Sequence, residues 1–227
     1  MITLSNVTRR YYLDDKTVIE PVSNVSLEIP QHEFVAIIGR SGSGKTTLLN
    51  LIAGLIKPSS GKIVIEGKEL QSMNDRELSA LRNRKIGFVF QFPSLLPSLR
   101  VIENVMLPRD FMNHNSRDSV SEHAAWLLEM VGLNKRLEAY PRHLSAGEQK
   151  RAVIARALIN KPQILLADEP TSDLDDKTEQ EIMSLLMNIH SNGVTVIMVT
   201  HNLQLVPFAS KAYKMENSSL TEISTVG

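Results

Sequence analysis

Apolar and polar residues alternate along the first thirty positions, and this period of two predicts β-strands. The alternation breaks near Asp14 and Asp15, where we expect a turn. An unbroken apolar run follows at Phe34–Ile38, and such a run is typical of a strand buried on both faces. The elements predicted in this part are strands at 2–12, 17–29, 34–38 and 62–67, and one helix at 46–53.

Helical spacing dominates the middle of the chain, and apolar strands alternate with a helix in its last third. Asn74 has the position of a helix cap, Pro108–Ser116 is expected to be an exposed loop, and Trp126 is expected to pack inside the helical region. The pattern predicts an α/β core that a helical segment interrupts at about 92–160. The remaining predicted elements are helices at 75–85, 101–113, 118–132, 147–160 and 176–191, strands at 86–90, 164–167 and 194–199, and a hairpin at 211–223.

Composition narrows the class of protein. The chain has 227 residues, with 25 Lys and Arg against 25 Asp and Glu, and it has no cysteine. Balanced charge offers no basic surface, so we expect no nucleic acid partner, and the lack of cysteine excludes disulfides and cysteine-bound metal. No apolar run reaches about 18 residues and the first ten residues lack a signal-peptide core, so we expect a soluble, cytoplasmic protein that contacts membranes only through a partner.

The most informative segment lies between the strand at 34–38 and the helix at 46–53, and it fits the pattern G-x-x-x-x-G-K-[ST]. Glycines in such a loop let backbone N–H groups surround phosphate oxygens. Lys45 would reach the β- and γ-phosphates, and the Thr46 hydroxyl would bind Mg²⁺. The expected nucleotide-binding residues are Gly39, Arg40, Ser41, Gly42, Ser43, Gly44, Lys45, Thr46 and Thr47.

A second candidate site follows the strand at 164–167, which ends in Asp168 and Glu169. A carboxylate at the carboxyl end of a strand beside the phosphate loop would hold Mg²⁺, and the next carboxylate can polarise an attacking water. Acidic residues also end strands as helix caps. With the phosphate loop present, the catalytic interpretation is the stronger one.

A third segment, Leu144–Gln149, opens a predicted helix with a serine and a glycine. Free N–H groups and the positive end of the helix dipole would form an anion site there, although a simple serine cap is the alternative. The segment resembles the signature motif of the ATP-binding cassette (ABC) ATPases, whose usual form is L-S-G-G-Q. Ala146 and Glu148 replace a glycine and the glutamine of that form. The resemblance implies ATP contacts from Ser145, Ala146, Gly147 and Glu148.

Further positions match the same family in the correct order. Gln91 resembles the Q-loop glutamine, with catalytic and metal-binding roles, and His201 resembles the switch histidine that contacts the γ-phosphate. Tyr12 has the place of the aromatic that stacks on adenine, with neighbouring Tyr11 or an ordinary strand aromatic as alternatives. The segment that resembles the D-loop is Ser172, Asp173, Leu174 and Asp175.

The resemblance covers nearly the whole chain and implies a P-loop NTPase core with a mostly parallel sheet, an N-terminal antiparallel β subdomain and an inserted helical subdomain. We expect one ABC ATPase domain, 1–227, with 1–91 and 161–227 as the catalytic core and 92–160 as the helical insertion. It further implies ATP hydrolysis with Mg²⁺, in which Glu169 activates water. Cassettes of this family pair head to tail, so we expect a homodimer whose signature segments act in trans.

The middle region is similar to the LolD/MacB/FtsE branch of the family. This implies a separate membrane permease as partner and a peripheral place on the inner face of the cell membrane. The partner would dock after Gln91, where Phe92, Leu95 and Leu96 are expected to be exposed, although packing within the loop is an equal alternative. A soluble ABC ATPase of a non-transport complex, such as one for iron–sulfur assembly, is the alternative function.

Overall fold

A six-stranded sheet forms the centre of the computed structural model, which describes residues 1–12, 14, 17–110 and 117–225. The strand order is β10-β9-β3-β8-β7-β6, and every neighbouring pair is parallel except β9 and β10. The strands are β3 (Phe34–Ile38), β6 (Ile86–Val89), β7 (Ile164–Asp168), β8 (Thr195–Thr200), β9 (Lys211–Glu216) and β10 (Ser219–Ile223). The mostly parallel sheet predicted from the apolar runs is confirmed.

Both faces of this sheet are buried because its central strands are apolar at consecutive positions. In β3, Phe34, Ala36 and Ile38 pack into one hydrophobic cluster, shared with helices α5 (Ala146–Leu158) and α6 (Asp176–Ser191). Val35 and Ile37 point the other way, into a cluster shared with α1 (Lys45–Ile52) and a second sheet. Because successive side chains of β3 point to opposite faces of the sheet, this one strand contributes to two hydrophobic cores.

The second sheet is antiparallel and has the order β2-β1-β4-β5. Ile2 lies opposite both Ile29 and Ile65, so the apolar positions of three strands share one buried face. The expected turn at 14–15 lies partly outside the described residues. The elements here are β1 (Ile2–Tyr12), β2 (Val18–Ile29), β4 (Ser60–Ile65), β5 (Lys68–Glu69), the short helix η1 (Leu70–Ser72) and α1 (Lys45–Ile52).

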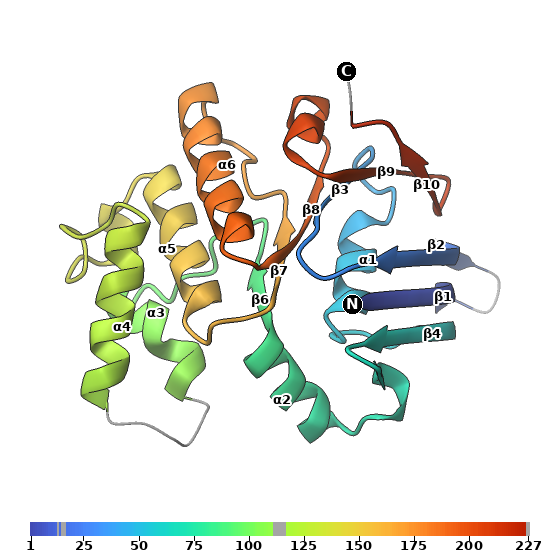
Figure 1. Cartoon of the computed structure of the whole chain (residues 1–227), viewed down its shortest axis with the longest axis horizontal. Helices are drawn as coiled ribbons and strands as arrows, with labels where there is room; N and C mark the ends of the chain where they lie inside the picture. The colour runs from blue at the N-terminus through green and yellow to red at the C-terminus, as the bar shows by residue number, and fades with distance from the viewer. Residues whose placement is uncertain (13, 15–16, 111–116, 226–227) are drawn as a thin grey trace.

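The helices fall into groups that Figure 1 separates clearly. Helices α3 (Val101–Asp110), α4 (Arg117–Met130) and α5 (Ala146–Leu158) pack together on one side of the central sheet, opposite the antiparallel sheet. The sequence signals at α2 are confirmed, because Asn74 and Glu77 form the reciprocal hydrogen bonds of a capping box. The other helices are α2 (Asp75–Lys85), η2 (Pro141–His143), α6 (Asp176–Ser191) and η3 (Leu203–Phe208).

Two expectations about the helical region are wrong. The loop expected from Pro108 starts later, because α3 continues through Pro108 to Asp110. The fixed φ of proline suits a helix, but its nitrogen has no hydrogen to donate to the carbonyl four residues earlier, so α3 lacks that hydrogen bond near its carboxyl end. Residues 111–116 lie outside the described residues. Trp126 is 56% exposed, since the helical period turns its neighbours Leu127 and Leu128 inward and leaves position 126 outside, stacked on His123.

Candidate active site

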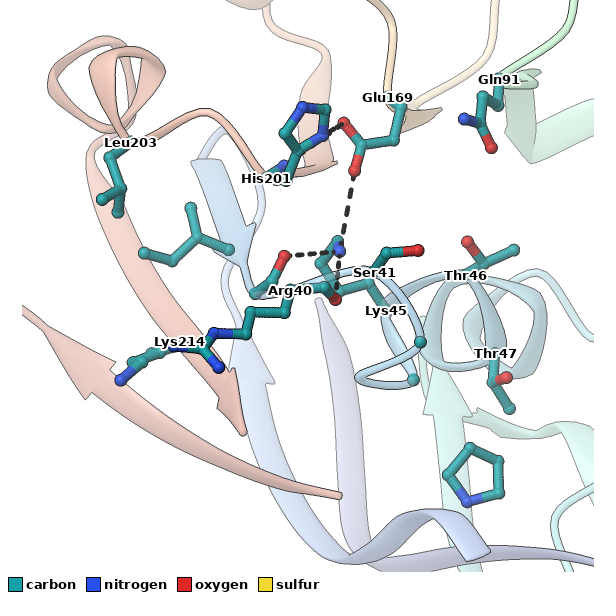
Figure 2. Close-up of a pocket in the computed structure, with 15 residues that line it drawn as sticks. Arg40, Ser41, Lys45, Thr46, Thr47, Gln91, Glu169, His201, Leu203 and Lys214 are labelled. Atoms are coloured by element: carbon teal, nitrogen blue, oxygen red, sulfur yellow. Dashed lines mark hydrogen bonds and ion pairs between the residues drawn. The ribbon is translucent and has the colours of Figure 1, made fainter. Parts of the chain in front are cut away.

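A pocket of about 720 Å³ opens at the carboxyl ends of the central strands. Ligands bind at this edge of α/β sheets in general. Figure 2 shows side chains from the phosphate loop, from the end of β7 and from the segment after β8 converging on it. Its lining residues are Pro21, Ile38, Gly39, Arg40, Ser41, Gly42, Gly44, Lys45, Thr46, Thr47, Gln91, Glu169, His201, Leu203 and Lys214.

The phosphate loop runs from β3 into α1, as the motif predicts. Gly44 begins the helix with φ 104°, in the left-handed region. A Cβ at this position would lie 2.0 Å from the Pro21 carbonyl oxygen, so only glycine lets the loop turn so close to β2. The loop therefore leads into the N-terminus of α1, where backbone N–H groups can bind an anion, although the Ser43 N–H already donates to the Arg40 carbonyl at 3.1 Å.

Lys45 places a buried ammonium group at the centre of the loop. Its Nζ donates hydrogen bonds to the Gly39 carbonyl at 2.7 Å and to the Arg40 carbonyl at 3.1 Å. The same Nζ lies 3.7 Å from Glu169 Oε1, and both side chains are almost fully buried. A cation at this depth is poorly screened by water, so it acts strongly on any phosphate that enters the pocket.

Glu169 has a strained backbone and a well-held carboxylate. Its φ is 46°, in the left-handed region that non-glycine residues seldom adopt. Its Oε2 accepts hydrogen bonds from His201, at 2.9 Å from the ring Nδ1 and at 3.3 Å from the backbone N–H. Lys45, Glu169 and His201 therefore form one continuous line of contacts, which Figure 2 shows across the pocket.

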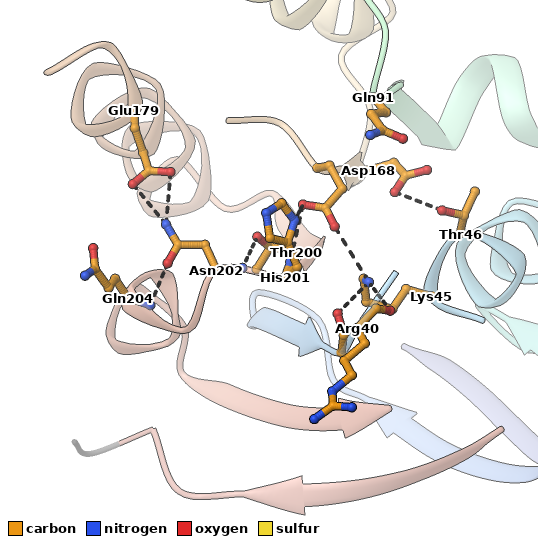
Figure 3. Close-up of polar contacts among 12 residues, drawn as sticks. Arg40, Lys45, Thr46, Gln91, Asp168, Glu179, Thr200, His201, Asn202 and Gln204 are labelled. Atoms are coloured by element: carbon orange, nitrogen blue, oxygen red, sulfur yellow. Dashed lines mark hydrogen bonds and ion pairs between the residues drawn. The ribbon is translucent and has the colours of Figure 1, made fainter. Parts of the chain in front are cut away.

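Thr46 and Asp168 bring two hard oxygen ligands together. The Thr46 hydroxyl donates to Asp168 Oδ1 at 3.2 Å, although β8 separates β7 from β3 in the sheet (Figure 3). Burial raises the pKa of Asp168, and the hydroxyl of Thr46 opposes that rise. Such an oxygen pair fits Mg²⁺, which takes one or two protein ligands and completes its shell with phosphate and water.

Gln91 also reaches the pocket from the segment after β6, and Figure 3 draws it beside Asp168. This place agrees with the position expected for it, and its roles in catalysis and metal binding stay predictions. No group of three or more His, Asp or Glu side chains that could hold a metal occurs among the residues described. A metal in this pocket would therefore depend on the nucleotide for most of its ligands.

Several predicted nucleotide-binding residues do not line the pocket. Tyr12 is 73% exposed at the end of β1, so its stacking on adenine stays a prediction. Ser43 turns inward, and its hydroxyl is buried without a hydrogen-bond partner among the described residues. The D-loop and signature residues, Ser172–Asp175 and 145–148, also lie outside the lining of this pocket.

The signature segment forms the start of α5. Ser145 caps the helix, since its hydroxyl accepts from the Glu148 N–H at 3.2 Å and Glu148 Oε2 accepts from the Ser145 N–H at 2.8 Å. The backbone N–H of Ser145 lowers the pKa of Glu148, and Arg136 adds to the effect. Ser145 and Ala146 are exposed, whereas the α-carbon of Gly147 faces the Thr178 methyl group at the start of α6. The positive end of this helix dipole is therefore exposed at Ser145 and Ala146.

The D-loop joins the end of β7 to α6. Asp175 caps α6 by accepting from the Thr178 N–H at 3.1 Å and from its hydroxyl at 2.7 Å. These hydrogen bonds lower the pKa of Asp175. Asp173 is exposed with φ 63°, and the Ser172 hydroxyl is buried without a partner among the described residues. The segment therefore presents the exposed carboxylate of Asp173 outside the pocket lining.

Sequence reasoning missed four lining residues: Ile38, which directly precedes the phosphate loop, and Pro21, Leu203 and Lys214. Pro21 belongs to β2, and Lys214 belongs to β9, which pairs with β3. No local signal marks them, because only the strand order brings them beside the phosphate loop. Leu203 follows His201 by two positions and could have been found from that spacing alone.

The arrangement has counterparts among known proteins. Residues 22–172 match the family model described as ABC transporter. An uncharacterised ABC transporter ATP-binding protein of Thermotoga maritima is 49% identical over 188 residues, covering 83% of this chain and 80% of that protein. The lipoprotein-releasing system ATP-binding protein LolD of Aquifex aeolicus is 42% identical over 208 residues, covering 91% of this chain and 92% of that protein.

The fold has a close counterpart among solved structures. The ATP-binding cassette MJ0796, in a dimeric post-hydrolysis state bound to ADP and Pi, has a TM-score of 0.92 and 39% identity and covers 100% of both chains. The mixed fold, with its parallel and antiparallel sheets, is therefore the one of ATP-binding cassettes. In the part of this chain that the structure describes, every helix is too short or too polar to cross a membrane.

Proposed function

We propose, given that this chain belongs to the ABC transporter family and is one of its ATPases, that it powers a separate membrane permease. The observation that carries the catalytic part is the line of contacts from Lys45 through Glu169 to His201, beside the Thr46–Asp168 pair. We treat residues 1–227 as one ABC ATPase domain, with 92–160 as its helical insertion. Relatives named LolD and MacB favour the branch that works with membrane partners.

Each residue of the site has a role in phosphoryl transfer to water. The carboxylate of Glu169, held by His201, accepts a proton from the attacking water and orients it. Lys45 neutralises charge that develops on the γ-phosphate, and the loop N–H groups share that task. His201 would contact the γ-phosphate, and Gln91, which also lines the pocket, would take part in catalysis. Thr46, Asp168 and Gln91 would hold Mg²⁺, which would neutralise part of the charge on the phosphates.

The site becomes complete when a second copy of this chain covers it. The pocket lacks the signature residues, while Ser145 and Ala146 lie exposed at the N-terminus of α5. In a head-to-tail homodimer, that helix end would meet the γ-phosphate held by the partner's loop. The relative MJ0796 was solved as a dimer with ADP and Pi, which supports this arrangement.

A variant test separates ATP binding from dimer formation. Glu169→Gln should form a stable dimer with ATP, and adding Ser145→Arg should keep it monomeric, because the longer cationic side chain blocks the exposed helix end. Sedimentation velocity with and without ATP measures this, and Ser184→Arg on the exposed face of α6 is the matched control. Persistent dimers in the Ser145→Arg variant, with ATP bound, would contradict a role in trans.

A second concave surface supports docking of the permease. A groove of about 540 Å³ lies between α2, β6, α3 and α5, and its apolar lining includes Phe88, Phe90 and Leu96. Phe88 and Phe90 stack with ring centroids 4.2 Å apart. Phe92 and Leu96 are exposed as expected, whereas Leu95 packs into the core and so follows the alternative of loop packing. An amphipathic helix of the permease fits such a groove.

The groove is held in shape from both ends. Asn104, fully buried in α3, accepts from the Leu96 N–H at 2.7 Å and donates to the carbonyls of Leu96, Leu99 and Arg100. Arg156 of α5 donates to the Ser94 carbonyl at 2.8 Å and to its hydroxyl at 2.9 Å. A rigid groove loses little entropy on binding, which favours a defined partner.

Substitution in the groove tests the transport part of the proposal. Leu96→Asp should abolish co-purification of Glu169→Gln cassettes with a multi-helix membrane protein, because a charge would be buried in an apolar contact. The ATPase activity of the isolated Leu96→Asp cassette, measured with Glu169 intact, should equal that of the wild-type chain. Leu55→Asp is the matched control, since Leu55 and Leu96 are both 46% exposed. Recovery of water-soluble partners alone would instead favour a non-transport complex.

A further inference from the structure

Lys150 is a buried cation that does not line the nucleotide pocket. Lys150 lies in the second turn of α5, and only 4% of its surface is exposed. Burial lowers the pKa of its ammonium, and the carboxylates of Asp173, Asp168 and Glu169 act in the opposite direction. A lysine is seldom buried unless it is paired, so its contacts indicate what it does.

The Lys150 ammonium joins two parts of the active site. It donates to the Gln91 carbonyl and, at 3.3 Å, to the Glu169 carbonyl. Gln91 follows β6 and Glu169 follows β7, the neighbouring strand of the sheet. The side chain therefore links the Q-loop to the residue that activates water, from below the pocket.

The backbone of Glu169 needs such support. A left-handed conformation in a non-glycine residue is strained and persists only where its surroundings fix it. Here the Glu169 N–H donates to the Val199 carbonyl at 2.9 Å, and the Glu169 carbonyl accepts from the Ser172 N–H at 3.2 Å and from Lys150. Among these hydrogen bonds to the Glu169 backbone, the one from Lys150 comes from a side chain, and that side chain belongs to the signature helix α5.

We propose that Lys150 is a positioning residue for ATP hydrolysis: it holds Glu169 in the turn that directs its carboxylate to Lys45 and His201, and it fixes this turn relative to Gln91. The inference rests on the proposed role of Glu169 as the group that activates water.

A near-isosteric substitution tests the inference. Lys150→Met keeps most of the side-chain volume and removes the hydrogen-bond donor. The rate of ATP turnover should fall about 10- to 100-fold, because small misplacements of catalytic groups cause losses of this size. The dissociation constant for a non-hydrolysable ATP analogue should stay within about threefold, since Lys150 does not touch the pocket. Lys135→Met, at an exposed lysine, is the control and should keep wild-type turnover.

A double-mutant cycle distinguishes positioning from a general structural role. In a Glu169→Gln background, Lys150→Met should lower the residual turnover by less than about twofold, because both changes act through one carboxylate. Equal losses in both backgrounds, or wild-type turnover in the folded Lys150→Met protein, would overturn the inference. If the methionine variant does not fold, Lys150→Gln enters the same cycle with the same expectations. Failure of the proposed function would appear differently, as absence of hydrolysis in the wild-type chain.

Discussion

Glu169→Gln is expected to lower ATP turnover by about 100- to 10,000-fold, the usual contribution of a general base. The amide has the shape of the carboxylate and can stay beside His201 and Lys45, yet it cannot accept a proton from water. The phosphate loop is expected to provide most of the contacts to ATP, so ATP affinity should be kept. Phosphate release at saturating ATP and equilibrium binding of ATP measure the two quantities separately.

The matched control for this variant is Glu181→Gln. Glu181 is a surface carboxylate of α6, paired with Arg151 at 2.9 Å and outside the pocket, so its neutralisation should leave turnover unchanged. A Glu169→Gln protein with near-normal turnover would remove the water-activating role from this residue.

Lys45→Ala is expected to raise the dissociation constant for ATP by about 10- to 100-fold, which corresponds to the loss of charged hydrogen bonds to phosphate. The loss also leaves Glu169 buried without its nearest cation, a second penalty on the site. Turnover should fall together with affinity. Titration of a fluorescent ATP analogue measures the binding, with thermal unfolding to show that the variant is folded.

Lys62→Ala provides the comparison, because Lys62 is an exposed lysine of β4 and lies outside the pocket. Its affinity for ATP should equal that of the wild-type chain. Unchanged affinity in Lys45→Ala would contradict the assignment of the phosphate loop.

Local signals explain why much of the fold could be predicted. The apolar run at 34–38 matches β3 at both ends, and Asn74 and Asp175 cap the helices that the pattern placed after them. Capping residues and buried strands act over a few positions, so a sequence window contains them whole. The phosphate loop could be predicted for the same reason, because its glycines, lysine and threonine lie within one short segment.

The remaining features depend on contacts between distant segments. Lys150 meets the Gln91 carbonyl across 59 positions, and Lys214 reaches the pocket because β9 pairs with β3. Leu95 was expected to be exposed and is buried, whereas Trp126 was expected to be buried and is exposed. The phase of the helix and the path of the loop decide which apolar residue turns inward. Such choices are settled by tertiary packing, which no window of sequence contains.

The most direct test of the account is the rate of ATP hydrolysis per chain, measured over a wide range of protein concentration. If two copies complete each site, the rate per chain should rise with concentration and level off once dimers dominate, because a lone chain lacks the signature residues at its pocket. A rate per chain that stays constant down to the lowest concentration would show that one chain holds the whole site. Absence of hydrolysis at every concentration would contradict the catalytic assignment itself.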